Sequence, residues 1–244
     1  MKKLILILAV CFSGINVFAQ SAAQLKNEGN AALKTKDYKT ALMSFENFIA
    51  AEDTFEDPAL IFNSGYCAIK IKDFAKAEKY FGQAIEKEYK LSSAYRFKAL
   101  AQKHQKKSDD MIATLEAGIK ACPTKKAKLS SMLAKHYLIE GQKAQKGNKF
   151  DAAEGLYKKA GDLKSKMQAN ALFSLGTLYY NKGAKIMQVA TPVANTQPEQ
   201  YKSESAKAQT FFRKALAELI KAKTIAPARK DITSTMATIK GLVK

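Results

Sequence analysis

The 244-residue sequence contains no tryptophan, two histidines, three cysteines and five prolines. So few histidines and cysteines leave little material for a metal site or a framework of disulfide bonds. The low proline content, together with only twelve glycines, excludes a collagen-like chain. Hydrophobic residues make up 47% of the sequence, which excludes a wholly disordered chain.

Acidic residues are also scarce, with 22 Asp and Glu against 41 Lys and Arg, so the formal net charge is +19. Lys, Ala and Leu are abundant, and these residues favour helix. A charge of this size would attract nucleic acid. The export signal described below argues against nucleic acid as a physiological partner.

Signatures of known catalytic and cofactor sites are missing from the sequence. It has no glycine-rich phosphate loop, no H-E-x-x-H, no C-x-x-C and no G-x-S-x-G. His104 and His136 lie far apart in the sequence without an evident partner. We therefore expect no catalytic residue, cofactor or metal, although an enzyme with an unrecognised site stays an alternative.

Residues 1–19 have the layout of a secretory signal peptide. Two lysines precede a mostly apolar run from Leu4 to Phe18, and the small residues Val17 and Ala19 stand at the −3 and −1 positions of a cleavage site. The run is shorter than the roughly 20 residues that span a bilayer as a helix. We therefore predict an exported, periplasmic protein with no transmembrane segment in the mature chain.

Two other interpretations of this segment stay open. The first is an uncleaved membrane anchor, and the second is a lipid anchor at Cys11, which follows the lipobox-like residues Leu8, Ala9 and Val10. Export would place Cys67 and Cys122 in an oxidising compartment. Their predicted positions in different helices favour buried small hydrophobic residues over a bridge, and their redox state stays open.

An internal repeat organises the rest of the chain. Four segments share a small residue, an apolar stretch, a turn, and then aromatic and alanine-like positions at fixed offsets. They are residues 25–49, 61–85, 95–123 and 137–161, with Gly29, Gly65, Ala99 and Gly141 in the small position. A fifth copy begins at 172–183 and resumes at 206–216 after an insertion.

These small and aromatic positions resemble the tetratricopeptide repeat (TPR) family, and the resemblance covers residues 22–227. It implies an all-α, right-handed α-solenoid of about five helical hairpins. A set of unrelated amphipathic helices is the competing interpretation, but it does not explain the shared phase. The expected helix pairs are 22–35/38–52, 57–71/74–88, 92–105/108–121, 126–146/149–164 and 168–189/199–225.

Within each hairpin, the small residues should let two helices approach closely. The aromatic residues are expected to fill the space between successive hairpins, and Asp37 and Asp73 are expected to cap the helices that follow them. The aromatic residues in question are Tyr38, Phe45, Phe74, Phe81, Phe150 and Tyr157.

The domain map has three parts: the signal peptide at 1–19, the solenoid at 20–227 and a C-terminal capping helix at 228–244. An insertion near 184–206 departs from the repeat pattern and contains two prolines. A long first helix, a loop near 190–198 and an early start to the second helix would accommodate it. Its role is either that of a surface loop or that of a binding element.

TPR proteins commonly bind their ligand in a concave groove lined by the first helix of each hairpin. The resemblance implies a basic groove with aromatic and amide groups, suited to an extended and possibly acidic segment. The alternative is that these lysines only keep a helix face hydrated. The groove residues are Lys26, Asn30, Lys34, Phe62, Tyr66, Lys70, Arg96, Lys103, His104, Lys135, Gln142, Lys146, Asn170, Thr177 and Tyr180.

The five-residue carboxylate clamp of chaperone-binding TPR domains is not expected. Lys26, Asn30 and Asn63 stand at three clamp positions, but Ser93 and Phe97 replace the two remaining basic residues. Two missing cations should severely weaken a site for two carboxylates.

The sequence therefore predicts a non-catalytic adaptor or scaffold for protein–protein interaction. Its signal sequence and long final repeat resemble those of TPR proteins of the Bacteroidetes cell envelope. The alternative is an electrostatic binder of anionic envelope polymers, such as polysaccharide or lipopolysaccharide, which the spread of positive charge also favours.

Overall fold

The computed structural model describes residues 21–51 and 57–243. The predicted signal peptide and Cys11 lie outside the described residues. Within those ranges, the regular structure is entirely helical, and none of the helices is both long enough and apolar enough to cross a membrane. The helices are α1 (Ala22–Lys34), α2 (Tyr38–Ala51), α3 (Pro58–Lys70), α4 (Phe74–Glu86), α5 (Leu91–His104), α6 (Ser108–Ala121), α7 (Ala127–Lys146), α8 (Phe150–Asp162), α9 (Gln168–Ala190), α10 (Pro198–Ile225) and α11 (Lys230–Lys240).

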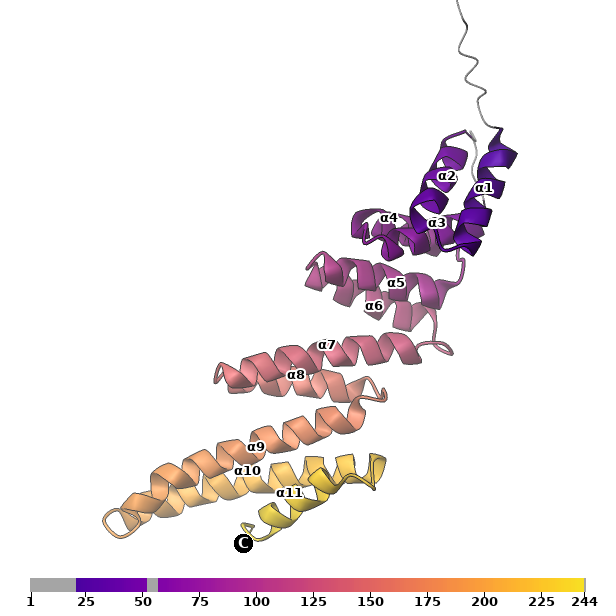
Figure 1. The fold of residues 1–244 in the computed structure, drawn as a ribbon. Coiled ribbons are helices and arrows are strands. Elements are labelled where there is room, and N and C mark those ends of the chain that lie inside the picture. Colours follow the sequence, from indigo (N-terminus) through magenta and orange to yellow (C-terminus); the bar gives the residue numbers. More distant parts are fainter. Residues whose placement is uncertain (1–20, 52–56, 244) are drawn as a thin grey trace, which may run out of the picture.

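The helices form five successive hairpins that stack side by side into an elongated solenoid, with α11 after the last (Figure 1). Each helix begins and ends within a few residues of its expected range. The predicted all-α solenoid is confirmed. Because each hairpin packs mainly on its neighbours, the hydrophobic core runs along the stack rather than around one centre.

An aromatic ring packed on a glycine sets the helix spacing in three of the hairpins. A Cβ atom added to Gly29 would lie 2.5 Å from the ring of Phe45, and one added to Gly141 would lie 2.6 Å from the ring of Tyr157. Gly65 faces Phe81 in the same way, at 3.1 Å. The absence of a side chain therefore creates the space that the ring of the second helix fills.

This arrangement adds a contact within the hairpin to the expected role of the aromatic residues. Phe45, Phe81 and Tyr157 are fully buried against the glycines of their own hairpins, and Phe81 also stacks on Phe97 of the next hairpin with ring centroids 5.1 Å apart. The rings at the start of α2 and α8 do reach the next hairpin. Tyr38 meets Tyr66 with ring centroids 6.0 Å apart, and Phe150 meets Tyr179 at 6.2 Å.

The turns inside the first four hairpins share one backbone form. A residue with positive φ lies two positions after the last residue of the first helix and two positions before the first residue of the second. Asp37 accepts a hydrogen bond from the backbone N–H of Thr40, and Asp73 accepts one from Lys76, so both predicted caps are confirmed. The left-handed residues are Lys36, Lys72, Lys106 and Asn148.

Glutamates on the second helices connect successive hairpins. Glu46 accepts hydrogen bonds from Tyr80 and Lys76, and Glu154 accepts one from Tyr179 of the next hairpin. Glu78 accepts bonds from Gln102, Gln105 and Lys107. Burial opposes the charged form of Glu78, but these donors outweigh it and lower the pKa of the carboxyl.

The insertion near 184–206 is mostly helical. α9 continues to Ala190, a short 3-10 turn covers Thr191–Val193, and α10 begins at Pro198. Proline suits this first helical position because its missing N–H would have no partner there. The segment thus has the expected long first helix, loop near 190–198 and early start of the second helix, and it lengthens the last hairpin (Figure 1).

The two cysteines of the described residues are both buried and are not bonded to each other. Cys67 lies in α3 and Cys122 directly follows α6, and neither forms a disulfide. Burial raises the pKa of the Cys67 thiol to about 11. Its thiol is therefore protonated at neutral pH and unreactive.

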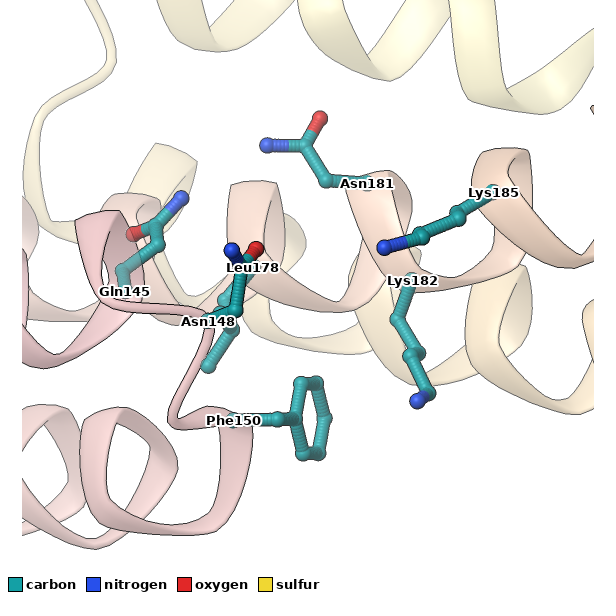
Figure 2. A pocket seen from close by; sticks show the side chains of 7 residues that line it. All are labelled: Gln145, Asn148, Phe150, Leu178, Asn181, Lys182 and Lys185. Carbon is teal, nitrogen blue, oxygen red and sulfur yellow. The ribbon is translucent and has the colours of Figure 1, made fainter.

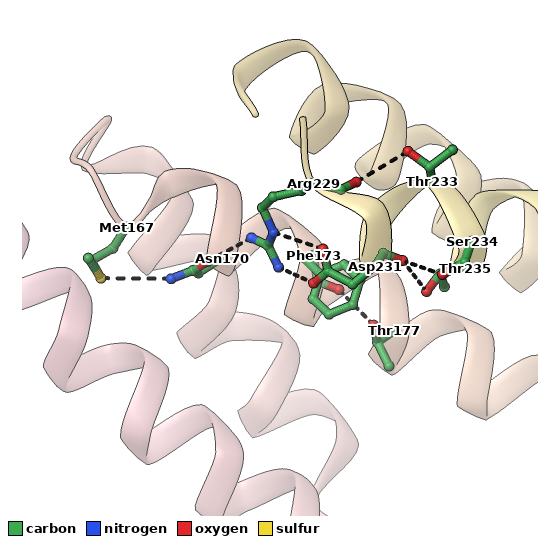
Figure 3. A network of polar contacts seen from close by, with 9 residues as sticks. All are labelled: Met167, Asn170, Phe173, Thr177, Arg229, Asp231, Thr233, Ser234 and Thr235. Atoms are coloured by element: carbon green, nitrogen blue, oxygen red, sulfur yellow. Dashed lines mark hydrogen bonds and ion pairs between the residues drawn. The ribbon is translucent and has the colours of Figure 1, made fainter. Parts of the chain in front are cut away.

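The C-terminal helix α11 packs on α10 through Ile232 and Ile239, both fully buried. Arg229, in the turn before α11, connects this end to α9 (Figure 3). Its guanidinium donates to the side chains of Asn170 and Asp231 and lies 4.9 Å from the ring centroid of Phe173. This network fixes the last helix relative to α9.

Adding a methyl group to the glycine–ring contact should destabilise the fold. We expect Gly141→Ala to lower the free energy of unfolding by about 1–3 kcal/mol, because the buried ring of Tyr157 would have to move. In Gly155→Ala, the new methyl group meets nothing within 4 Å, and helix propensity should raise stability by up to about 1 kcal/mol. Urea unfolding of both variants gives the comparison, and equal shifts would contradict the packing role.

Removing the Arg229 side chain should loosen the C-terminal helix without unfolding the stack. We expect Arg229→Ala to cost about 1 kcal/mol, a value typical of partly exposed charge-assisted contacts. Amide hydrogen exchange should accelerate in α11 and stay unchanged in α3 and α4. The neighbouring exposed Lys230, changed to Ala, serves as control, and equal acceleration in both variants would argue against the network.

Candidate functional site

A wide basic cleft lies where α5, the start of α7 and the turn between α8 and α9 meet. Its volume is about 1050 Å³. Seven cationic side chains and one carboxylate, that of Asp162, line it together with the apolar side chains of Leu100, Met132, Leu163 and Met167. The cations that define this basic cleft are Arg96, Lys103, Lys126, Lys128, Lys135, Lys164 and Lys166.

Helical spacing brings four of these cations to the cleft, two on one face of α5 and two on one face of α7. Arg96 and Lys103 are seven residues apart on α5, and Lys128 and Lys135 are seven apart on α7, so each pair lies on one helix face. The remaining cations come from the connections between helices. Ser92 holds one connection in place by donating a hydrogen bond to the carbonyl oxygen of Lys125.

The cleft cations are available to an external anion. None of the seven forms an ion pair with a carboxylate in the described part of the chain. The guanidinium of Arg96 lies 4.0 Å from the ring centroid of Phe97, and its partial burial lowers its pKa. Arginine stays charged at neutral pH in spite of such a shift.

Two long helices begin beside this cleft, which adds to its positive potential. α7 begins at Ala127 and α9 at Gln168, and no side chain among the described residues caps either start. The free N–H groups of a first helical turn carry partial positive charge. Backbone and side chains therefore both favour a negatively charged ligand here.

Three of the predicted groove residues, Arg96, Lys103 and Lys135, come together in the basic cleft. Gln142 and Lys146 are exposed further along α7. Asn30 and Lys34 are exposed on α1, in the first hairpin. The predicted groove is thus not one continuous set of contacts.

Three predicted residues of the first hairpins have partners within the protein. Lys26 forms an ion pair with Asp57 at 2.8 Å. Asp57 in turn caps α3, so Lys26 helps to join the first two hairpins. Lys70 lies 5.2 Å from the ring centroid of Tyr66, which is itself half-buried.

Phe62 requires correction as a groove residue. It is only 7% exposed, because its ring packs in a cluster with Phe81, Tyr89 and Phe97. The ring of His104 stacks on Phe74 with centroids 4.3 Å apart, but His104 stays exposed.

The last hairpin also uses its predicted groove residues internally. Asn170 accepts a hydrogen bond from Arg229, and the hydroxyl of Thr177 donates to the carbonyl oxygen of Phe173 (Figure 3). Tyr180 is half-buried, with its ring centroid 6.1 Å from that of Phe212. The turn before α11 thus occupies part of the groove face of α9.

Four lysines that complete the basic cleft are not among the predicted groove residues. Lys126, Lys128, Lys164 and Lys166 lie in or next to the connections between hairpins, outside the first-helix positions taken from the family. The available signal was the clustering of lysines at residues 125–128 and 164–166, directly before two long helices.

In the described residues, no three His, Cys, Asp or Glu side chains gather in a way that could hold a metal ion. The ionisable groups with displaced pKa values sit mainly in contacts between helices. Tyr179 is one of these: burial and its hydrogen bond to Glu154 both raise the pKa of its hydroxyl group.

Comparison with known proteins points to one family. No protein-family model matches the chain. A crystal structure of a TPR repeats protein from Bacteroides fragilis is 40% identical, with a TM-score of 0.82, and the match covers 91% of this chain and 99% of that one. More distant likenesses include MamA from Desulfovibrio magneticus (17% identity, 81% and 94% coverage, TM-score 0.41) and YrrB, described as a TPR protein with an unusual peptide-binding site (13%, 88% and 91%, 0.42).

Proposed function

Because this chain belongs to the tetratricopeptide repeat family, we propose that it is a non-catalytic scaffold that binds an extended, acidic segment of a partner protein in its basic cleft. The fold supports a role in protein–protein interaction. The finer assignment rests on one observation, which is the gathering of seven unpaired cations around a single open cleft.

The shape and chemistry of the basic cleft favour a chain segment over a small molecule. Small-molecule sites typically enclose about 300–1,000 Å³ and are mostly apolar. The cleft lies just above that range at about 1050 Å³, and it combines cations with apolar side chains such as Leu100 and Met132. Such a surface suits a segment that alternates carboxylates with apolar residues.

Electrostatic binding of anionic envelope polymers is the second candidate. The net charge of +19 favours it, since many lysines lie outside the cleft. The two functions differ in whether binding depends on the position of particular lysines or only on the total positive charge. A polymer held by overall charge should respond equally to any lysine and weaken steeply with salt, because exposed charges are screened within about 8 Å at physiological ionic strength.

We place this function in the cell envelope, with export directed by residues 1–19 and a periplasmic mature chain. The layout of that segment supports the proposal. A lipid anchor at Cys11 is the alternative form of attachment.

Reversing charge in the basic cleft should weaken partner binding about tenfold or more. The test variant replaces Lys103, Lys135 and Lys166 by Glu, because each exposed charged contact is worth about 0.2–1 kcal/mol and reversal adds repulsion. The binding partner is first identified by cross-linking in the native envelope fraction, and its affinity is then measured with purified components.

The matched control carries the same change of net charge on exposed lysines outside the cleft, namely Lys39, Lys202 and Lys240. The control should bind the partner as the unchanged protein does. Equal losses in both triple variants would favour binding by overall charge. Unchanged affinity of the cleft variant would contradict the proposed site.

Export should remove the leader and leave Gln20 as the first residue of the mature chain. The measurement is the intact mass and N-terminal sequence of the protein recovered from the periplasm of a Gram-negative host. A membrane-bound form that begins at Cys11 and disappears in Cys11→Ser would instead support the lipid anchor. A full-length chain retained in the cytoplasm would contradict export.

A further inference from the structure

We propose that a second, smaller pocket binds one ring of an acidic sugar, such as a uronic acid residue. This amide pocket lies between the turn that joins α7 to α8 and the middle of α9 (Figure 2). It shares no residue with the basic cleft, so it does not depend on the function proposed above. Its lining residues are Gln145, Asn148, Phe150, Leu178, Asn181, Lys182 and Lys185.

Three carboxamides give this pocket an unusual chemical character. A carboxamide both donates and accepts hydrogen bonds, so it matches a hydroxyl group, which does the same. The side chains of Asn148, in the turn between α7 and α8, and of Asn181, on α9, make no hydrogen bond to the described residues and border the pocket (Figure 2). A ligand with several hydroxyl groups would satisfy them.

The third carboxamide, that of Gln145, is oriented by a buried contact. Its Oε1 atom accepts a hydrogen bond of 2.7 Å from the hydroxyl of Tyr157. Burial raises the pKa of Tyr157, so this hydroxyl stays protonated and donates at neutral pH. With its oxygen engaged, Gln145 offers its NH₂ group as a donor to the pocket.

Lys182 and Lys185 add positive charge on one side of the amide pocket (Figure 2). Neither forms an ion pair with a carboxylate of the described residues. The ammonium of Lys182 lies 5.4 Å from the ring centroid of Phe150, whereas Lys185 has no such contact. Lys185 is therefore the better placed of the two to meet a carboxylate.

Phe150 and Leu178 supply an apolar wall that suits the C–H groups of a sugar ring. The ring of Phe150 also contacts the rings of Tyr179 and Phe211, with centroids 6.2 and 5.8 Å away. A supported ring loses little freedom on binding. Hydroxyl-matching amides, a free cation and an apolar wall together match a hydroxylated ring that carries one carboxylate.

The size of the amide pocket favours a single ring over a peptide segment. Its volume of about 230 Å³ is below the range typical of sites for drug-sized ligands. The basic cleft, at about 1050 Å³, has the room that an extended segment needs. A single acidic side chain of a peptide would still fit, so an acidic peptide is the rival ligand that the experiment must exclude.

Titration calorimetry with the full mature chain tests the assignment with four probes: glucuronic acid, glucose, acetate and N-acetyl-glutamate N-methylamide. We expect glucuronic acid to bind at least about tenfold more tightly than the other three. Glucose lacks the carboxylate and acetate lacks the hydroxyl groups, while the glutamate derivative represents an acidic peptide. Binding of that derivative as tight as that of glucuronic acid would overturn the proposal, as would no binding of glucuronic acid at tens of millimolar.

Two exposed positions separate the contributions of charge and of hydrogen bonds. Lys185→Met should reduce binding of glucuronic acid to the level of glucose, and Asn181→Ala should weaken both sugars severalfold. Lys39→Met, at an exposed lysine outside both pockets, removes the same charge at a distance and should leave the binding unchanged. Equal losses in Lys39→Met and Lys185→Met would reduce the effect to general attraction and overturn the site.

Discussion

The close approach of two helices at a glycine is the constraint on which this architecture depends. In the hairpins built on Gly29, Gly65 and Gly141, the space of a missing side chain is filled by a buried ring of the second helix. In these three hairpins the ring therefore sets how closely the two helices approach. Because a hairpin of this kind buries the rest of its apolar surface on its neighbours, the hairpins stack into a solenoid.

Contacts between hairpins use a different chemistry. Glu46, Glu78 and Glu154 each accept hydrogen bonds from the following hairpin, at sites where packing partly excludes water. Such bonds add modest stability when formed, but an unpaired buried carboxylate costs more than the bond supplies. They therefore act mainly on register: a hairpin that slid by one turn would leave its neighbour's glutamate without donors.

The repeat phase made the helices predictable, because it depends on contacts inside each hairpin that recur in the sequence. The groove was less predictable, because family positions describe where a side chain points and not what it meets. Lys26 points toward the groove side but pairs with Asp57, and Phe62 is covered by the aromatic rings around it. Whether a groove residue is free to bind a ligand depends on neighbours that can be distant in the sequence. The partner of Lys26, for example, lies 31 residues further along the chain.

The lysines in the connections were missed for a related reason. Their convergence depends on the three-dimensional course of two turns, between α6 and α7 and between α8 and α9, which no repeat position encodes. Only a lysine cluster in the sequence marks them. The repeat positions do not constrain the residues of these turns. A stacked repeat protein can therefore acquire binding residues of its own in the turns between hairpins.

The two pockets lie at opposite ends of α7, and the helix dipole distinguishes them. The basic cleft surrounds its first residues, where the partial positive charge of the backbone adds to that of the lysines. The amide pocket includes Gln145 and Asn148 at its other end, where the backbone carries partial negative charge. There Lys182 and Lys185 must first offset the dipole, which leaves less net attraction for a dense anion. Neutral hydrogen-bonding groups then decide what binds, so the first site should select by charge and the second by hydroxyl pattern.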